Sequence, residues 1–197
     1  MKQKFAHIAA ILLFFFGSAI SAHAGLLNRT LDAQYFFPDT STPYGLSSAT
    51  PSTFVVGAGI ETTFDVEGVT QIVTDFGDTS LRFDFVTTLP TPIWNPAAFN
   101  GVIFNRVAGA FLSLLSASID PISTMSGFDA SRVTFNDNQI AINWNGLSYI
   151  NGTTLLINFV SASNSVPEPG TIALLVLGLF SIFIGRRKME KAASHTP

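Results

Sequence analysis

The chain contains no cysteine. It therefore has no disulfide, no thiolate zinc site and no cysteine nucleophile, and an apolar core must hold it together. Its three histidines, His7, His23 and His195, lie near the two ends, so residues 25–165, which we call the body, lack histidine and also lack lysine. This absence excludes Ser-His-Asp catalysis, imidazole metal ligands and Schiff-base lysines from the body.

Positive charge is scarce in the body, where four arginines stand against eleven carboxylates and the net charge is −7. The whole chain carries only −3 because six of its ten basic residues lie in the two terminal segments. Nucleic acids and anionic lipid surfaces both need a cationic footprint on the protein. We therefore expect no nucleic-acid partner for the body.

The N-terminal segment has the three parts of a secretory signal peptide. Two lysines near the start precede the apolar run Ile8–Phe16, and Ala22 and Ala24 then form a small-x-small cleavage site. The apolar run is too short for a permanent anchor. We therefore predict that residues 1–24 are removed by signal peptidase and that the mature chain begins at Gly25.

The body is predicted to be all-β. In the run from Arg82 to Thr87, apolar and polar residues alternate with period two, which puts Phe83 and Phe85 on one face of a strand and Arg82 and Asp84 on the other. Similar short β-rich runs recur between clusters of turn residues. The predicted strands are 31–37, 52–57, 61–66, 70–76, 80–87, 101–107, 132–136, 139–144 and 154–160.

Turn signals of the right kind separate these runs. Residues 136–138, Asn-Asp-Asn, predict a hairpin loop, and the Asn-Gly pairs at 145–146 and 151–152 tolerate positive φ. Many short strands at this spacing favour an antiparallel β-sandwich, jelly-roll-like, over a barrel. The Ser-, Thr- and Pro-rich segment 40–53 is predicted to be a long surface loop, and 108–119 can be a helix or a strand.

Carboxylates are the side chains of the body most able to carry chemistry. Glu61, Asp65, Glu67, Asp75, Asp78 and Asp84 fall within one stretch. A pair of them held across a sugar bond would make a glycoside hydrolase, but carboxylates on the wet face of a sheet are the usual case, so we expect no enzyme. Asp75, Asp78 and Asp137 are weak candidates for calcium in loops that do not match the twelve-residue calcium pattern, and we expect no cofactor.

Aromatic side chains offer a binding role instead. Trp94 lies in a Pro-flanked loop and is predicted to be exposed, so that it and Tyr44 are the candidates for stacking on sugar rings. Trp144 alternates with Ile140 and Ile142 and is predicted to be buried.

The C-terminal segment begins with Val166, Pro167, Glu168 and Pro169, continues through a charge-free run from 171 to 185, and ends with Arg186, Arg187 and Lys188. As a helix, the run of 15 residues is about 22 Å long, and flanking residues with a snorkelling arginine bring it closer to the roughly 30 Å hydrocarbon core. We predict a single transmembrane helix at 170–185, with the cationic cluster and a tail, 189–197, in the cytoplasm.

These three parts resemble the PEP-CTERM sorting signal of Gram-negative bacteria that make exopolysaccharide, with the signal spanning 166–188. The resemblance implies recognition by an exosortase, a membrane-embedded cysteine protease. It also implies export through the inner membrane, transient anchoring there, and delivery to the cell surface or the extracellular biofilm matrix. The expected role is structural or adhesive and linked to exopolysaccharide. A carbohydrate-binding module is the alternative, and a carboxylate-based glycoside hydrolase is the third hypothesis.

Overall fold

The structure is a computed structural model in which residues 25–110, 112–162 and 177–178 are described. The predicted signal peptide, 1–24, and cytoplasmic tail, 189–197, lie outside these ranges. The predicted transmembrane helix 170–185 also lies outside them, apart from Leu177 and Gly178, which are helical. Among the described residues, no helix has the length and apolar character needed to cross a membrane.

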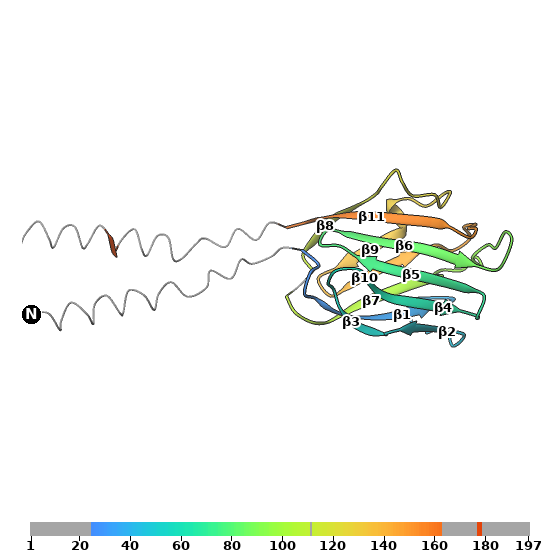
Figure 1. Ribbon diagram of the computed structural model, residues 1–197, viewed down its shortest axis with the longest axis horizontal. Helices are drawn as coiled ribbons and strands as arrows, with labels where there is room; N and C mark the ends of the chain where they lie inside the picture. The colour runs from blue at the N-terminus through green and yellow to red at the C-terminus, as the bar shows by residue number, and fades with distance from the viewer. Residues whose placement is uncertain (1–24, 111, 163–176, 179–197) are drawn as a thin grey trace, which may run out of the picture. The chain divides into compact units, whose positions relative to one another are not determined.

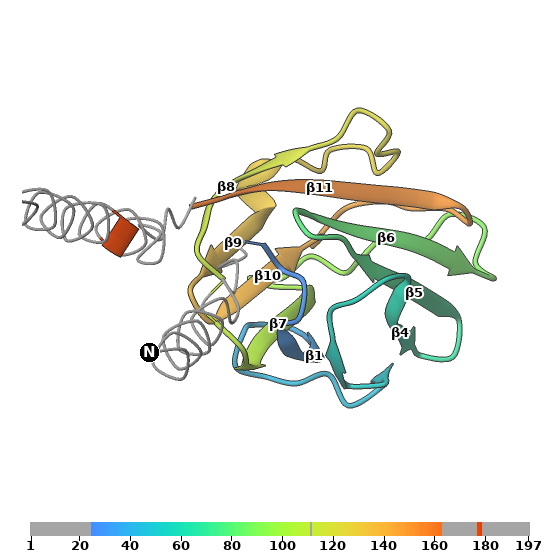
Figure 2. The same ribbon diagram turned by 60° about the vertical axis from the view of Figure 1, so that its left-hand side comes forward.

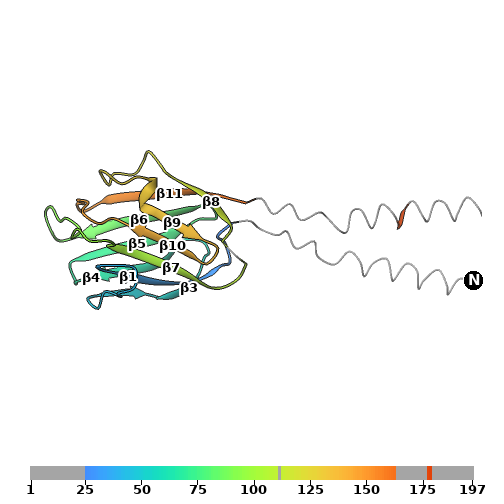
Figure 3. The same cartoon turned by 180° about the vertical axis from the view of Figure 1, so that it is seen from behind.

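The body is all-β and forms two antiparallel sheets, visible as two layers in Figure 1 and, from behind, in Figure 3. The five-stranded sheet has the order β3 (Thr53–Val55), β1 (Thr30–Phe36), β7 (Gly101–Ala108), β10 (Gln139–Asn143), β9 (Val133–Asn136). The six-stranded sheet has the order β2 (Ser47–Thr50), β4 (Ile60–Val66), β5 (Thr70–Phe76), β6 (Ser80–Thr87), β11 (Thr153–Ser161), β8 (Leu114–Ile119). A short 3-10 turn, Ala130–Arg132, precedes β9.

Alternation of side chains positions the core between the sheets. Phe83 and Phe85 of β6 are fully buried as predicted, whereas Arg82 and Asp84 on the other face are partly exposed and pair with each other, Nε to Oδ2, at 2.7 Å. Phe104 of β7 reaches across from the five-stranded sheet and stacks on Phe83, with ring centroids 6.2 Å apart. The two sheets therefore pack face to face on a shared aromatic core.

The structure corrects the prediction for one segment and decides between the two alternatives for another. The predicted surface loop 40–53 is wrong in part, because it contains β2, which pairs with β4 from Ser47↔Val66 to Thr50↔Thr63. The segment 108–119, left open as helix or strand, supplies the edge strand β8. Figure 2 shows β8 beside β11, with β6 on the other side of β11. The predicted hairpin 136–138 joins β9 to β10, whereas the expected jelly-roll connectivity stays a prediction.

The body has two distinct ends. Its first and last described segments meet at the β5–β6 turn, where the Leu26 N–H donates to the Asp78 carbonyl at 2.7 Å and the Phe159 N–H donates to the Thr79 carbonyl at 2.8 Å. Strand β5 runs from Thr70 to Phe76, and its seven extended residues place Thr70 roughly 20 Å from this turn. Loops at that far end enclose the candidate site.

Candidate functional site

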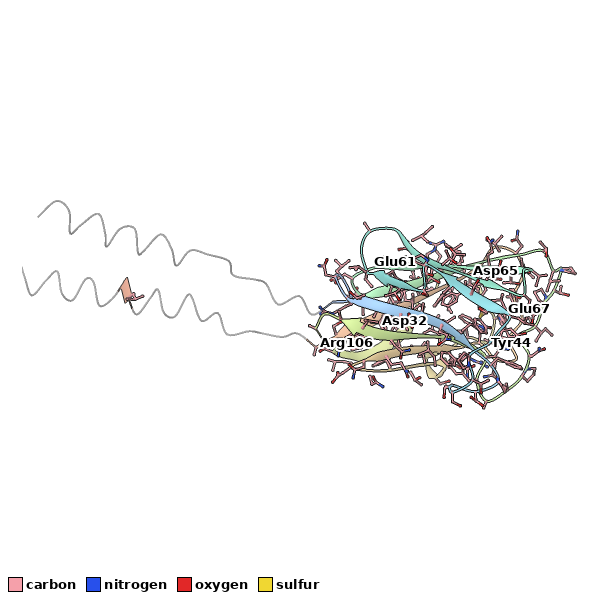
Figure 4. All side chains as sticks on the ribbon, turned by 90° about the horizontal axis from the view of Figure 1, so that it is seen from below. Asp32, Tyr44, Glu61, Asp65, Glu67 and Arg106 are labelled. Carbon is pink, nitrogen blue, oxygen red and sulfur yellow. The ribbon has the colours of Figure 1, made fainter. Side chains whose placement is uncertain are left out.

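A pocket of about 160 Å³ opens at the end of the body opposite the β5–β6 turn. Four separate segments line it: the end of β1 with the following loop, the β4–β5 turn, the long β6–β7 loop and the β10–β11 loop. Figure 4 shows Tyr44 and Glu67 together at this end and Arg106 at the opposite one. The volume is enough for several waters or one small chemical group, and is below the roughly 300–1,000 Å³ of drug-sized sites.

Tyr44 and Glu67 form the polar rim of the pocket. The Tyr44 hydroxyl donates a hydrogen bond to Glu67 Oε1. This bond, with burial and the charge of Glu67 adding to it, raises the pKa of Tyr44 to about 12. Glu67 occupies the β4–β5 turn with φ of 56°, a left-handed conformation that is uncommon for a residue other than glycine. Its backbone N–H donates to the Leu46 carbonyl at 2.8 Å, which ties the turn to the loop after β1.

Two stacked rings form the inner wall. Trp94 and Tyr149 lie nearly parallel, with ring centroids 4.5 Å apart and an interplanar angle of 10°. The Tyr149 hydroxyl is hydrogen-bonded to Thr70 Oγ1 at 2.8 Å, and Thr70 donates to Thr87 Oγ1 at 3.0 Å. Burial raises the pKa of Tyr149 and outweighs these hydrogen bonds, which lower it. The wall is therefore fixed by contacts within the core.

A buried relay supports the floor of the pocket. The Trp144 Nε1–H donates to the Tyr35 hydroxyl at 2.8 Å, and this hydroxyl donates to Asn100 Oδ1 at 2.6 Å. Asn100 in turn donates from Nδ2 to the Asn95 carbonyl at 3.0 Å. Burial is the main reason that the pKa of Tyr35 lies well above its usual range. These bonds fix the geometry of the floor, because each buried polar group already has its partner.

The structure corrects one expectation about the aromatic candidates. Trp94 was predicted to be exposed, but only 6% of its surface is accessible, because it packs against Tyr149 and Trp144. It nevertheless lines the pocket, as does Tyr44. Its Nε1–H is buried and has no acceptor in the part of the chain that the structure describes. Trp144 is fully buried, as predicted.

The candidate carboxylates do not gather in the pocket. Glu61 is buried, and its carboxylate accepts from the backbone N–H groups of Gly57 and Phe76 at 2.9 and 2.6 Å, which is a structural role. Glu67 is the one carboxylate among the described residues that line the pocket, so the pair needed for sugar hydrolysis is not present there.

The calcium candidates lie apart from the pocket. Asp75 is the second-last residue of β5, Asp78 lies in the β5–β6 turn, and Asp137 lies in the β9–β10 turn. In the described ranges, no three carboxylate, histidine or cysteine side chains come together to hold a metal ion. The expectations that the protein has no cofactor and is not an enzyme stay predictions.

Sequence reasoning missed the pocket itself, and with it the contributions of Glu67, Asn100 and Thr70. No local signal marks these residues, because the pocket is assembled from segments up to 114 positions apart, from Tyr35 to Tyr149.

The predicted processing residues Ala22, Ala24, Val166–Pro169 and Arg186–Lys188 lie outside the described ranges. Gly25 is described, and a Cβ built on it would lie 1.7 Å from Asp78 Oδ1, so the Asp78 side chain would have to shift to make room for any other residue.

Comparison with known proteins bears on the C-terminal segment alone. No curated protein and no solved structure gave a significant match to the chain. Residues 165–188 match the family model described as the PEP-CTERM protein-sorting motif. This motif implies export, a membrane-anchored sorting signal, and an exosortase as the processing partner. The chain thus carries a PEP-CTERM protein-sorting motif at residues 165–188.

Proposed function

We propose that the body is a structural or adhesive protein of the extracellular polysaccharide matrix in a Gram-negative biofilm. The observation that carries this proposal is the sorting motif at 165–188. In the proposed route, signal peptidase cuts after Ala24, the helix 170–185 holds the chain in the inner membrane, and exosortase cuts near Pro167–Pro169. The body is then released or joined to a component of the cell surface.

The composition and packing of the body support a structural role outside the cell. It has no cysteine that could be oxidised or mispaired, and its stability rests on a core in which Phe83, Phe85 and Phe104 are fully buried. Burying a side chain of this size is worth about 1.5–3 kcal/mol. Its net charge of −7 disfavours self-association and attachment to anionic membrane lipids.

Intact-mass analysis of the protein from the envelope and medium of its native host tests the route. We expect a species that begins at Gly25 and ends between Val166 and Pro169, with or without an added group. Replacing Pro167, Glu168 and Pro169 by alanine is expected to block the C-terminal cut. Replacing Ser163 and Asn164 by alanine is the matched control and should leave it unchanged. A mature species that retains every residue through Pro197 would contradict sorting by cleavage.

A carbohydrate-binding module is the second candidate, and the pocket favours it. Aromatic rings line the pocket, and the partly exposed Tyr44 at its rim offers both a ring and a hydroxyl to a sugar. The test is retention of the protein on immobilised exopolysaccharide from the same host. Tyr44→Ala removes this ring and its hydroxyl, and we expect it to weaken retention. Equal retention of both proteins would argue against this use of the pocket.

A further inference from the structure

The pocket is an acidic site in an acidic body. Glu67 is the only charged residue among the described residues that line it, and none of them is arginine, lysine or histidine. Glu67 Oε1 accepts from Tyr44, whereas Oε2 has no partner among the hydrogen bonds of the described residues. The left-handed backbone at Glu67 belongs to the tight β4–β5 hairpin turn, in which Gly68 follows with φ of 67°. A group that enters the pocket therefore meets a carboxylate held in a fixed turn.

The charge of Glu67 acts across the whole pocket. Burial is the main cause of the raised pKa of Tyr35 and of Tyr149, and the hydrogen bond to Glu67 is the main cause for Tyr44; the charge of Glu67 adds to the rise in all three. A negative potential that disfavours a phenolate at three places favours a cation at the same places. The net charge of −7 on the body adds to this potential at longer range.

Five aromatic residues, Tyr35, Phe37, Tyr44, Trp94 and Tyr149, line the pocket beside aliphatic and neutral polar ones. Phe37 and Tyr44 meet edge to face, with ring centroids 5.7 Å apart and an interplanar angle of 75°. Tyr35 packs beside Tyr44 at 6.1 Å with its ring tilted by 48°. Aromatic rings carry negative charge on their faces, so a ring face that borders the pocket attracts an organic cation.

The same lining disfavours a metal ion. Calcium needs six to eight oxygen ligands, usually several of them carboxylates, and the pocket has one carboxylate among its described lining residues. A cation that carries its own apolar groups needs no such shell. The volume of about 160 Å³ fits a small head group of this kind.

We propose that the pocket binds the ammonium group of an organic cation, with Glu67 supplying the charge and Tyr44 and Phe37 the aromatic faces. The cation can be a small quaternary ammonium compound such as choline, or the protonated amine of a de-acetylated amino sugar. Both share the positively charged nitrogen that the site recognises. This inference concerns the pocket alone and holds whether or not the chain is sorted.

The test compares ligands that differ only in charge, using the full-length protein in a non-ionic detergent and titration calorimetry. Choline is compared with 3,3-dimethylbutan-1-ol, in which a carbon replaces the charged nitrogen. Glucosamine is compared with glucose, in which a neutral hydroxyl group replaces the ammonium group. We expect at least one cation to bind about tenfold or more tightly than its neutral partner. The choline pair and the glucosamine pair together identify the source of the ammonium group.

Two variants locate the binding. Glu67→Gln keeps the size of the side chain and removes its charge, and we expect it to weaken binding of the cation about three- to tenfold. Asp137→Asn makes the same change of net charge in the β9–β10 turn, away from the pocket, and is expected to leave binding unchanged. Thermal unfolding of each variant checks that it is folded.

Three results would overturn the proposal. The first is equal binding of the charged and neutral partners in both pairs, including no binding of any of the four. The second is a selectivity for cations that folded Glu67→Gln retains in full. The third is an equal loss in Glu67→Gln and Asp137→Asn, which would indicate attraction to the whole acidic body. None of these results depends on export or cleavage, which the mass analysis tests separately.

Discussion

Removing one hydroxyl from the buried relay under the pocket should cost far more stability than removing a similar one from its rim. Tyr35→Phe deletes the oxygen that accepts from Trp144 Nε1 at 2.8 Å and donates to Asn100 Oδ1 at 2.6 Å. Both partners are buried, and Trp144 has no exposed surface. Each polar group left without a partner in such a place costs about 1–3 kcal/mol. The expected loss is therefore about 3 kcal/mol, which corresponds to a fall in Tm of about 10 °C for a domain of this size.

Tyr44→Phe is the matched control, because it deletes a hydroxyl whose acceptor, a Glu67 oxygen, can turn to water. It should cost less than about 1 kcal/mol. Equilibrium unfolding in urea, followed by tryptophan fluorescence, measures both free energies, and an unchanged m-value would show that the denatured state is the same. A loss for Tyr35→Phe that is below about 1 kcal/mol, or no larger than for Tyr44→Phe, would refute the reasoning.

Three further predictions concern a backbone contact, a buried carboxylate and the tyrosines. Gly101→Ala places a Cβ 1.9 Å from a carbonyl oxygen of β10, so we expect the free energy of unfolding to fall by at least about 3 kcal/mol, or the protein not to fold. Gly45→Ala is the control: its Cβ has nothing within 4 Å, and thermal unfolding should be unchanged. Burial raises the pKa of Glu61 above its ordinary value of 4.5, so its contribution to stability is present below that value and is lost as the pH rises above it. Glu61→Gln should remove this fall in stability from unfolding curves measured from pH 4.5 upward, and an unchanged slope would contradict the reasoning. Because the pKa of Tyr44 is raised to about 12, its contribution to stability should be lost as the pH rises from 10 through 12. Ultraviolet titration of Glu67→Gln should show a tyrosine that ionises at a lower pH than in the wild type.

The fold was predictable where local pattern and burial agree. Strands β5 and β6 begin and end where the alternation and the turn residues place them. Strand β2 was missed because its sequence, Ser-Ser-Ala-Thr, is small and polar, with partly exposed and exposed residues alternating on an edge. Its strand character comes from pairing with β4, which a local pattern does not contain.

The candidate site was also predictable only in part, because contacts between distant segments form it. The two aromatic candidates, Trp94 and Tyr44, do line the pocket. The prediction that Trp94 is exposed was wrong. Proline-flanked loops are usually exposed to solvent, whereas here residues from the β10–β11 region cover the indole. Glu67 could not be singled out among six nearby carboxylates, since only the meeting of the β4–β5 turn with the loop after β1 gives it a tyrosine partner.

The position of β11 determines how the body would respond to mechanical load. This strand lies between β6 and β8, hydrogen-bonded to both, and its last residues lead toward the sorting motif. The pocket lies at the opposite end of the sheets, so tension between a ligand held there and a C-terminal attachment would act along the strand axis. Ladder hydrogen bonds perpendicular to this axis are loaded together in shear and do not open one after another. An anchored body with this topology would resist extraction of its terminal strand, as a tether under flow requires.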